Sequence, residues 1–175
     1  MMSKKNKLGF TLIELLMVMA IIIIMSIIVV TRHHGSKENL EVKMSANKLA
    51  QDLRRVEEMA MSNMKPPVYP IPDAFNGTYG IVFNEGINGY KLFADLNNNN
   101  DCDLSDWQES TSLTSESIIV YDLDPLNPLV ILFTPPDPTI TIPGSSSEAL
   151  ITIRSNINLQ EKTIKINEAG LIETY

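Results

Sequence analysis

Residues 10–31 read FTLIELLMVMAIIIIMSIIVVT, and this stretch decides the fold class of the whole chain. Its 22 residues include one charged side chain, Glu14. At about 1.5 Å of rise per residue, a helix of this length is roughly 33 Å long, which is enough to cross the hydrocarbon core of a bilayer. Isoleucine and valine favour strands in water, but lipid requires every backbone group to be satisfied internally. We therefore expect a transmembrane helix.

Basic residues before this stretch predict its orientation. Lys4, Lys5 and Lys7 precede it, and lysines beside a span favour the cytoplasmic side. The apolar run is also longer than the roughly 7–15 residues of a cleavable secretory signal. We expect a single-pass protein with a cytoplasmic N-terminus, whose remaining chain lies outside the cytoplasm.

Glu14 is costly inside such a span, by about 2.5–3.5 kcal/mol at its centre and by less near an end. One reading is that its carboxylate reaches back to the membrane interface. The other is that it needs a cationic partner, which cleavage before Phe10 would supply as a new α-amino group. Two charges that are costly separately in lipid become tolerable as a pair.

The sequence around this carboxylate, KLGFTLIELL at residues 7–16, resembles the prepilin-peptidase site of type IV pilins and type II secretion pseudopilins. The resemblance implies a leader, residues 1–9, that ends at Gly9 and is removed by a prepilin peptidase. It implies that Phe10 becomes the N-methylated mature N-terminus. It further implies that Glu14 pairs with the Phe10 amine of a neighbouring pilin or pseudopilin in a helical filament rooted in the inner (cytoplasmic) membrane.

A second helical pattern follows the span. Leu49, Leu53, Val56 and Ala60 recur at helical spacing, so we expect residues 32–64 to continue the helix as an amphipathic half. Four prolines between residues 66 and 72 end the pattern. Residues 65–175 then read as a β-rich domain, expected to be periplasmic or extracellular.

Short runs of β-forming residues bounded by turn residues predict the strands of this domain. Residues 78–83 and 90–94 flank a loop rich in turn formers and predict a hairpin. Further strands are expected at residues 117–123, 129–133, 139–142, 149–154 and 162–167, and a turn is expected at residues 169–170. One long helix followed only by strands predicts a pilin-like α+β fold, with the helix packed on one face of an antiparallel sheet.

The loop DLNNNNDCDLSD at residues 95–106 concentrates the oxygen ligands that calcium prefers. Carboxylate or amide side chains occupy loop positions 1, 3, 5, 7, 9 and 12, namely Asp95, Asn97, Asn99, Asp101, Asp103 and Asp106. Asn100 stands where such calcium loops have glycine, and an aspartate ends the loop instead of glutamate. A calcium site and a solvated Asn/Asp turn both remain open, and no cofactor is required. Cys102 is interpreted as an incidental residue of this loop in preference to a thiolate nucleophile.

The amino-acid composition argues against several other classes of protein function. The two histidines are adjacent, at residues 33 and 34, so a His-based triad or a multi-His metal centre is not available. The sequence also lacks a glycine-rich phosphate loop, and we do not expect an enzyme. A single cysteine excludes an intrachain disulfide. The net charge of -7 argues against nucleic-acid binding by bulk phosphate neutralisation.

These observations favour a structural subunit, a minor pilin or pseudopilin, of a type IV filament or a type II secretion pseudopilus. The stretches LAQDLRRVEEMAMSN, TYGIVF, YKLFADLNNN and TIKINEAGLIE resemble GspH/FimT-type minor subunits. One alternative is a DNA-capturing minor pilin of a competence pilus, although Arg154, Lys162 and Lys165 are the only basic residues after Lys91. The other is a membrane-anchored protein that never polymerises.

Overall fold

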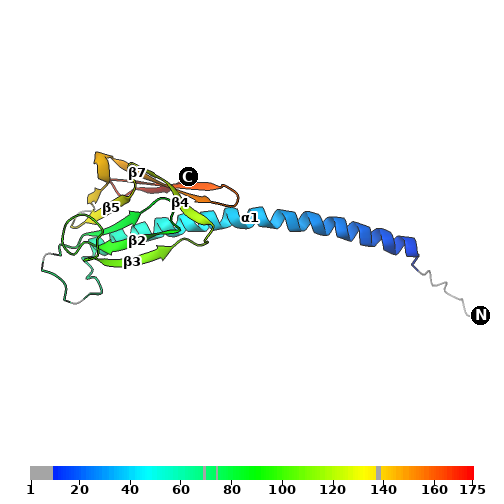
Figure 1. The fold of residues 1–175 in the computed structure, drawn as a ribbon, viewed down its shortest axis with the longest axis horizontal. Helices are drawn as coiled ribbons and strands as arrows, with labels where there is room; N and C mark the ends of the chain where they lie inside the picture. The colour runs from blue at the N-terminus through cyan, green and yellow to red at the C-terminus, as the bar shows by residue number, and fades with distance from the viewer. Residues whose placement is uncertain (1–9, 69, 74, 137–138) are drawn as a thin grey trace, which may run out of the picture. The chain divides into compact units, whose positions relative to one another are not determined.

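The computed structural model describes residues 10–68, 70–73, 75–136 and 139–175, without the side chains of residues 29–36 and 145. The leader, residues 1–9, and with it Gly9 lie outside the described residues. The chain divides into two compact units, Met1–Lys37 and Glu38–Tyr175. The helix α1 (Leu12–Met61) begins in the first unit and ends in the second (Figure 1).

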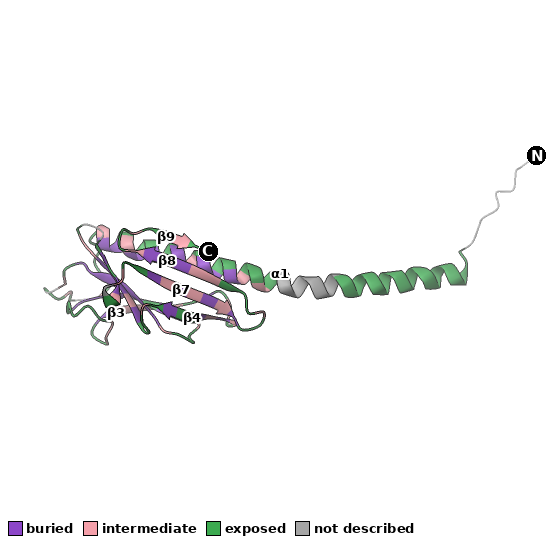
Figure 2. Cartoon of the chain, turned by 90° about the horizontal axis from the view of Figure 1, so that it is seen from above, coloured by how far each residue is buried: buried purple, intermediate pink, exposed green. Residues whose placement is uncertain are grey.

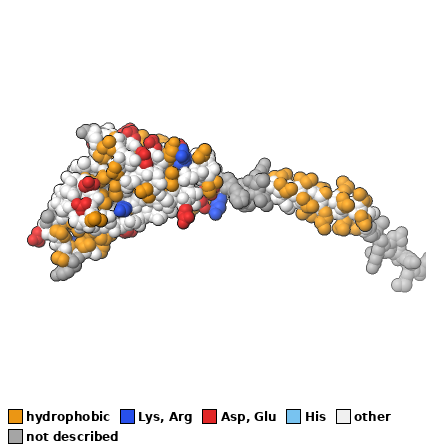
Figure 3. Space-filling model, in the orientation of Figure 1, with side chains coloured by type: hydrophobic (Ala, Val, Ile, Leu, Met, Phe, Trp, Pro, Cys, Tyr) orange, Lys and Arg blue, Asp and Glu red, His pale blue; other side chains and the backbone are white. Residues whose placement is uncertain are grey.

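In the first unit, α1 is apolar and open to solvent. Every residue from Phe10 to Ile28 is exposed, and Figure 3 shows hydrophobic side chains over this part of the helix. Over the residues that the structure describes, no helical segment has the length and apolar character needed to cross a membrane. The membrane span expected at residues 10–31 therefore stays a prediction.

The second unit contains two antiparallel sheets in its described part (Figure 1). The five-stranded sheet has the order β3-β2-β1-β5-β6. Its strands are β1 (Tyr79–Phe83), β2 (Gly89–Ala94), β3 (Trp107–Ser112), β5 (Leu129–Thr134) and β6 (Thr139–Thr141). The four-stranded sheet has the order β4-β7-β8-β9. Its strands are β4 (Ile118–Asp124), β7 (Glu148–Ser155), β8 (Glu161–Asn167) and β9 (Ile172–Thr174), and a short 3-10 helix, η1 (Pro143–Ser145), precedes β7.

Each sheet has a buried apolar face, and in the four-stranded sheet this face follows from alternation along the strand. In β7, Ala149, Ile151 and Ile153 are buried, whereas Thr152 and Arg154 between and after them are only partly buried (Figure 2). Successive side chains of a strand point to opposite faces, so the buried set lies on one side of the sheet. That side must pack against another element to be stable.

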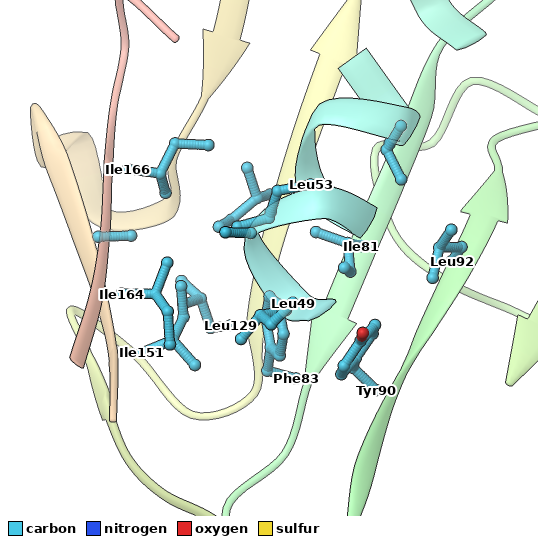
Figure 4. Close-up of a cluster of buried hydrophobic side chains, with 14 of the residues drawn as sticks. Leu49, Leu53, Ile81, Phe83, Tyr90, Leu92, Leu129, Ile151, Ile164 and Ile166 are labelled. Atoms are coloured by element: carbon cyan, nitrogen blue, oxygen red, sulfur yellow. The ribbon is translucent and has the colours of Figure 1, made fainter. Parts of the chain in front are cut away.

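The second half of α1 covers both of these apolar faces (Figure 4). Leu49 and Leu53 are fully buried, with Ile81 of the five-stranded sheet on one side and Ile151 and Ile164 of the four-stranded sheet on the other. The α+β class and the helix on antiparallel strands are thus confirmed. The expectation of one sheet is wrong, because the strands form two sheets that share the helix.

α1 ends at Met61, just before the expected end at residue 64. Asn63 takes a positive φ of 48°, and its N–H donates to the carbonyl of Ala60 at 3.0 Å. The N–H of Met64 donates to the carbonyl of Met59 at 3.1 Å. This pair of bonds around a left-handed residue is the Schellman motif, which satisfies the last carbonyls of a helix.

One strand, β3, is absent from the sequence-based expectation. Its sequence WQESTS has a single large apolar side chain, Trp107, and shows no apolar alternation. It is a strand because it pairs along the edge of β2, with Ser110 opposite Lys91. The predicted strands are confirmed as β1, β2 and β4–β8, with ends displaced by at most one residue, and β9 follows the turn expected at residues 169–170.

Replacing Leu53 with alanine tests the shared core. Leu53 is 0% exposed and Leu40, on the same helix, is 57% exposed. We expect Leu53→Ala to lower the free energy of unfolding by about 2–5 kcal/mol, because it removes buried methyl groups and leaves a cavity. The control Leu40→Ala should stay within about 0.5 kcal/mol of wild type. Denaturant unfolding of the full chain in detergent, followed by Trp107 fluorescence, measures both, and equal losses would contradict this core.

Candidate functional site

The expected processing site adjoins the start of α1. Phe10 is 76% exposed and immediately precedes the first turn, and Glu14 lies within that turn. Gly9 is outside the described residues, so the geometry of the scissile bond is not part of the structure. An exposed Phe10 is consistent with access by a peptidase.

Thr11 caps the helix that carries Glu14. Its Oγ1 accepts the backbone N–H of Glu14 at 3.3 Å, and its carbonyl accepts the N–H groups of Glu14 and Leu15, each at 3.2 Å. The Thr11 hydroxyl also lies 3.4 Å from the Glu14 carboxylate and donates to it. A threonine at the N-cap satisfies an otherwise unpaired N–H, and a carboxylate in the first turn is favoured by the helix dipole.

The sequence analysis did not single out Thr11. The signal was present, since a threonine followed three residues later by a glutamate is the capping-box pattern. Among the described residues, the Thr11 hydroxyl is the side-chain partner of the Glu14 carboxylate, and no ion pair to Glu14 occurs there. The carboxylate is exposed at the beginning of α1 and can accept a further donor.

Two aspartates close the loop expected to bind calcium. The buried Asp95 accepts the backbone N–H of Asn99 at 3.1 Å and that of Asn100 at 2.8 Å, one with each carboxylate oxygen. At the other end, Asp106 accepts the N–H of Leu96 at 2.9 Å. Its second oxygen accepts the N–H of residue 103 at 3.0 Å. Burial is the main reason that the pKa of Asp106 is raised. Both carboxylates therefore already accept hydrogen bonds from backbone N–H groups.

Asp103 collects further donors at the loop surface. It accepts the hydroxyl and the backbone N–H of Ser105, and the side-chain amides of Asn97 and Asn99 at 2.9 Å each. These bonds, led by the Ser105 hydroxyl, lower the pKa of Asp103 to about 2. Asp101 accepts the N–H of the following residue at 2.8 Å. The charged form of Asp103 is thus stabilised by N–H and O–H groups of the loop itself.

The six predicted calcium ligands lie in one loop. Their side-chain oxygens accept hydrogen bonds from N–H and O–H groups of that loop. Within the described ranges, three or more acidic, histidine or cysteine side chains are nowhere grouped so as to hold a metal ion. Calcium binding at the six positions stays a prediction.

Cys102 holds the loop against the outer face of the five-stranded sheet. It packs on a small cluster of Val82, Phe93 and Leu132, which is separate from the main core. Phe93 fits there because Gly80, opposite it in β1, has no side chain: a Cβ at Gly80 would lie 2.4 Å from the Phe93 ring. Cys102 therefore has a structural role that its position in the sequence did not reveal.

Two of the basic residues that a DNA-binding surface would need are already paired. Arg154 lies 3.8 Å from Glu161, and its guanidinium stacks 3.4 Å from the centre of the Tyr121 ring. Lys165 forms an ion pair with Glu148, which raises the pKa of the lysine. Charges neutralised in this way leave little positive potential for phosphates.

The chain matches the family model described as the prokaryotic N-terminal methylation motif, at residues 4–30. The chain carries this motif. It is consistent with a type IV pilin or pseudopilin, and it implies processing by prepilin peptidase and assembly with pilins. The motif is structural and not enzymatic. No curated protein and no solved structure matches the chain.

The loop thiol gives a first test of this geometry. Burial raises the pKa of Cys102 from 9.0 to about 11. Only the thiolate is nucleophilic, so at pH 8 the folded chain should react with iodoacetamide roughly 100-fold more slowly than the unfolded chain, and the rate should rise as the pH approaches 11. Leu104→Cys in a Cys102→Ser background is the control, because Leu104 is fully exposed. Equal rates at the two positions would contradict the packing of Cys102.

A calcium titration decides between the two readings of the loop. Because backbone N–H groups already occupy the Asp95 and Asp106 carboxylates, we expect millimolar calcium and excess chelator to give the same midpoint of thermal unfolding. Asp103→Asn is the matched variant. A midpoint that rises with calcium in the wild type and not in Asp103→Asn would establish the calcium site instead.

Proposed function

We propose that this chain is a structural subunit, a minor pilin or pseudopilin, of a type IV filament or a type II secretion pseudopilus. The observation that carries the proposal is the methylation motif at residues 4–30, which coincides with an exposed apolar helix. Prepilin peptidase would remove residues 1–9, and Phe10 would be methylated at its new amino group.

The exposed apolar surface of α1 supplies the driving force for assembly. Leu12 is 82% exposed and Ile28 is 46% exposed, and the large apolar side chains between them are similarly open. Such a surface is unfavourable in water and marks a contact with lipid or with other proteins. We propose that residues 10–31 anchor the subunit once across the inner membrane, with residues 65–175 on the outer side. Neighbouring helices then replace lipid in the filament.

Glu14 would set the register of this assembly. The Thr11 cap holds it in the first turn of α1, one turn from the amine that cleavage creates on Phe10. Pairing between the carboxylate of one subunit and the amine of the next offsets the cost of placing either charge in an apolar environment. Contacts that run head to tail without closing generate a helical filament.

The two alternatives receive less support. DNA capture needs an open basic patch, and both Arg154 and Lys165 have glutamate partners. A membrane-anchored protein that never polymerises needs no charge pairing at Glu14. The experiment below therefore separates it from the proposed subunit.

Glu14→Ala should block assembly without blocking maturation. In cells that express the chain with its own filament machinery, mass spectrometry should show wild type and variant both beginning at N-methylated Phe10. The variant should be reduced roughly tenfold or more in the polymer fraction, as a loss of about 1.4 kcal/mol or more of pairing would produce. Glu58→Ala, at an exposed glutamate of the same helix, is the control. Normal incorporation of Glu14→Ala would refute the assembly role, and a chain that begins upstream of Phe10 would refute the processing.

A further inference from the structure

The tip of the β7–β8 hairpin, residues 156–160 with the sequence NINLQ, directs two large apolar side chains into solvent. Ile157 is 68% exposed and Leu159 is 64% exposed, and the tip has no charged residue. Leu159 also has a positive φ of 57°, a conformation that suits glycine or asparagine and is unfavourable for leucine. An apolar side chain kept at an exposed and strained position points to a contact outside the isolated domain.

The backbone of this tip is satisfied from within the domain. Four of its N–H groups have protein acceptors. These bonds run from Asn156 to the Ser117 carbonyl (2.8 Å), from Ile157 to Ser155 Oγ (3.2 Å), from Leu159 to the Ser155 carbonyl (3.0 Å) and from Gln160 to Asn158 Oδ1 (3.1 Å). Paired donors can enter a poorly hydrated environment without the cost of unsatisfied polar groups.

Polar side chains of the hairpin bind α1 instead of facing outward. Asn158 donates from Nδ2 to Oδ1 of Asn39 at 3.0 Å. At the base of the tip, Ser155 donates to the Glu38 carboxylate at 3.1 Å. These bonds tie the tip to the chain at a point 11 residues after Ile28. Few residues of the chain therefore separate the attachment point of the tip from the apolar stretch.

We propose that residues 156–160 form a lipid contact in which Ile157 and Leu159 enter the headgroup region of the membrane that anchors α1. The proposal rests on the proposed function, because it requires that anchor. The short tether and the absence of charge favour a lipid surface over a neighbouring subunit, since specific protein interfaces have a polar rim with directed hydrogen bonds. Asn156 and Gln160, exposed and uncharged, flank the two apolar residues at the level of the headgroups.

The test uses the full chain in vesicles of phosphatidylethanolamine and phosphatidylglycerol, with single cysteines in a Cys102→Ser background that carry an environment-sensitive fluorophore. The tested position is Ile157→Cys. The matched control is Leu171→Cys, a 52% exposed leucine in the β8–β9 turn. It follows Gly170, where a Cβ would lie 2.9 Å from the Glu57 carboxylate. Glu57 lies roughly 27 Å along α1 from Asn39. Leu15→Cys reports whether the anchor itself is in lipid.

We expect the label at position 157 to be quenched by nitroxides on lipid headgroups, and several-fold less by aqueous iodide than the label at position 171. Added salt, or replacement of phosphatidylglycerol by phosphatidylcholine, should leave this protection unchanged, because the contact is apolar. Loss of protection under either change would mean a contact driven by charge and would overturn the inference.

Failure of the inference is distinguishable from failure of the proposed function. If the label at position 15 is in lipid and the label at position 157 is as accessible to iodide as that at position 171, the lipid contact is refuted and the anchor stands. If position 15 is also accessible to iodide, the membrane anchor is refuted and the inference with it. Protection at position 157 that disappears when the chain is diluted with excess lipid would assign the tip to a neighbouring subunit and overturn the inference.

Discussion

Burial of one apolar face of α1 holds the globular unit together. Leu49 and Leu53 lie where the apolar faces of both sheets meet, and each sheet would otherwise leave that face open to water. Directional hydrogen bonds between the same part of the helix and the five-stranded sheet accompany this apolar packing. Tyr90 donates to Asp52 at 2.6 Å, and Arg55 forms two hydrogen bonds to Glu109 at 3.1 Å each. The helix is thus the element around which the strands are arranged.

The same helix has the opposite surface chemistry in the first unit. There the described side chains are exposed and almost all apolar, and such a surface is typical of a site that contacts other proteins or a membrane. One carboxylate, Glu14, interrupts this surface, at a turn that Thr11 caps. The apolar side chains of the second half of α1 are buried by the sheets, whereas those of the first half are exposed. This contrast supports the proposal of a subunit that is stored in a membrane and assembled through its N-terminus.

Much of the fold could be predicted from local patterns. The helical stripe at Leu49 and Leu53, the first hairpin and most strands were recognisable, because alternation and turn residues report on neighbours that are close in sequence. β3 was not, because its polar sequence becomes a strand only by pairing with β2. The division into two sheets also escaped prediction, since it depends on distant pairings such as Ile81 with Ile131. At the candidate site, the cluster on which Cys102 packs could not be predicted, because it requires the absence of a side chain at Gly80.

The methylation motif, the apolar helix with its single carboxylate and the α+β class could be recognised from the amino-acid sequence, because each depends on residues that are close together in the chain. The tertiary structure alone decided that two sheets share one helix and that the Asp/Asn loop is closed by its own backbone N–H groups. It also decided that the β7–β8 tip is tied to α1 at Asn39. These features arise from contacts between residues far apart in the chain, whose partners are chosen by the packing of the whole domain.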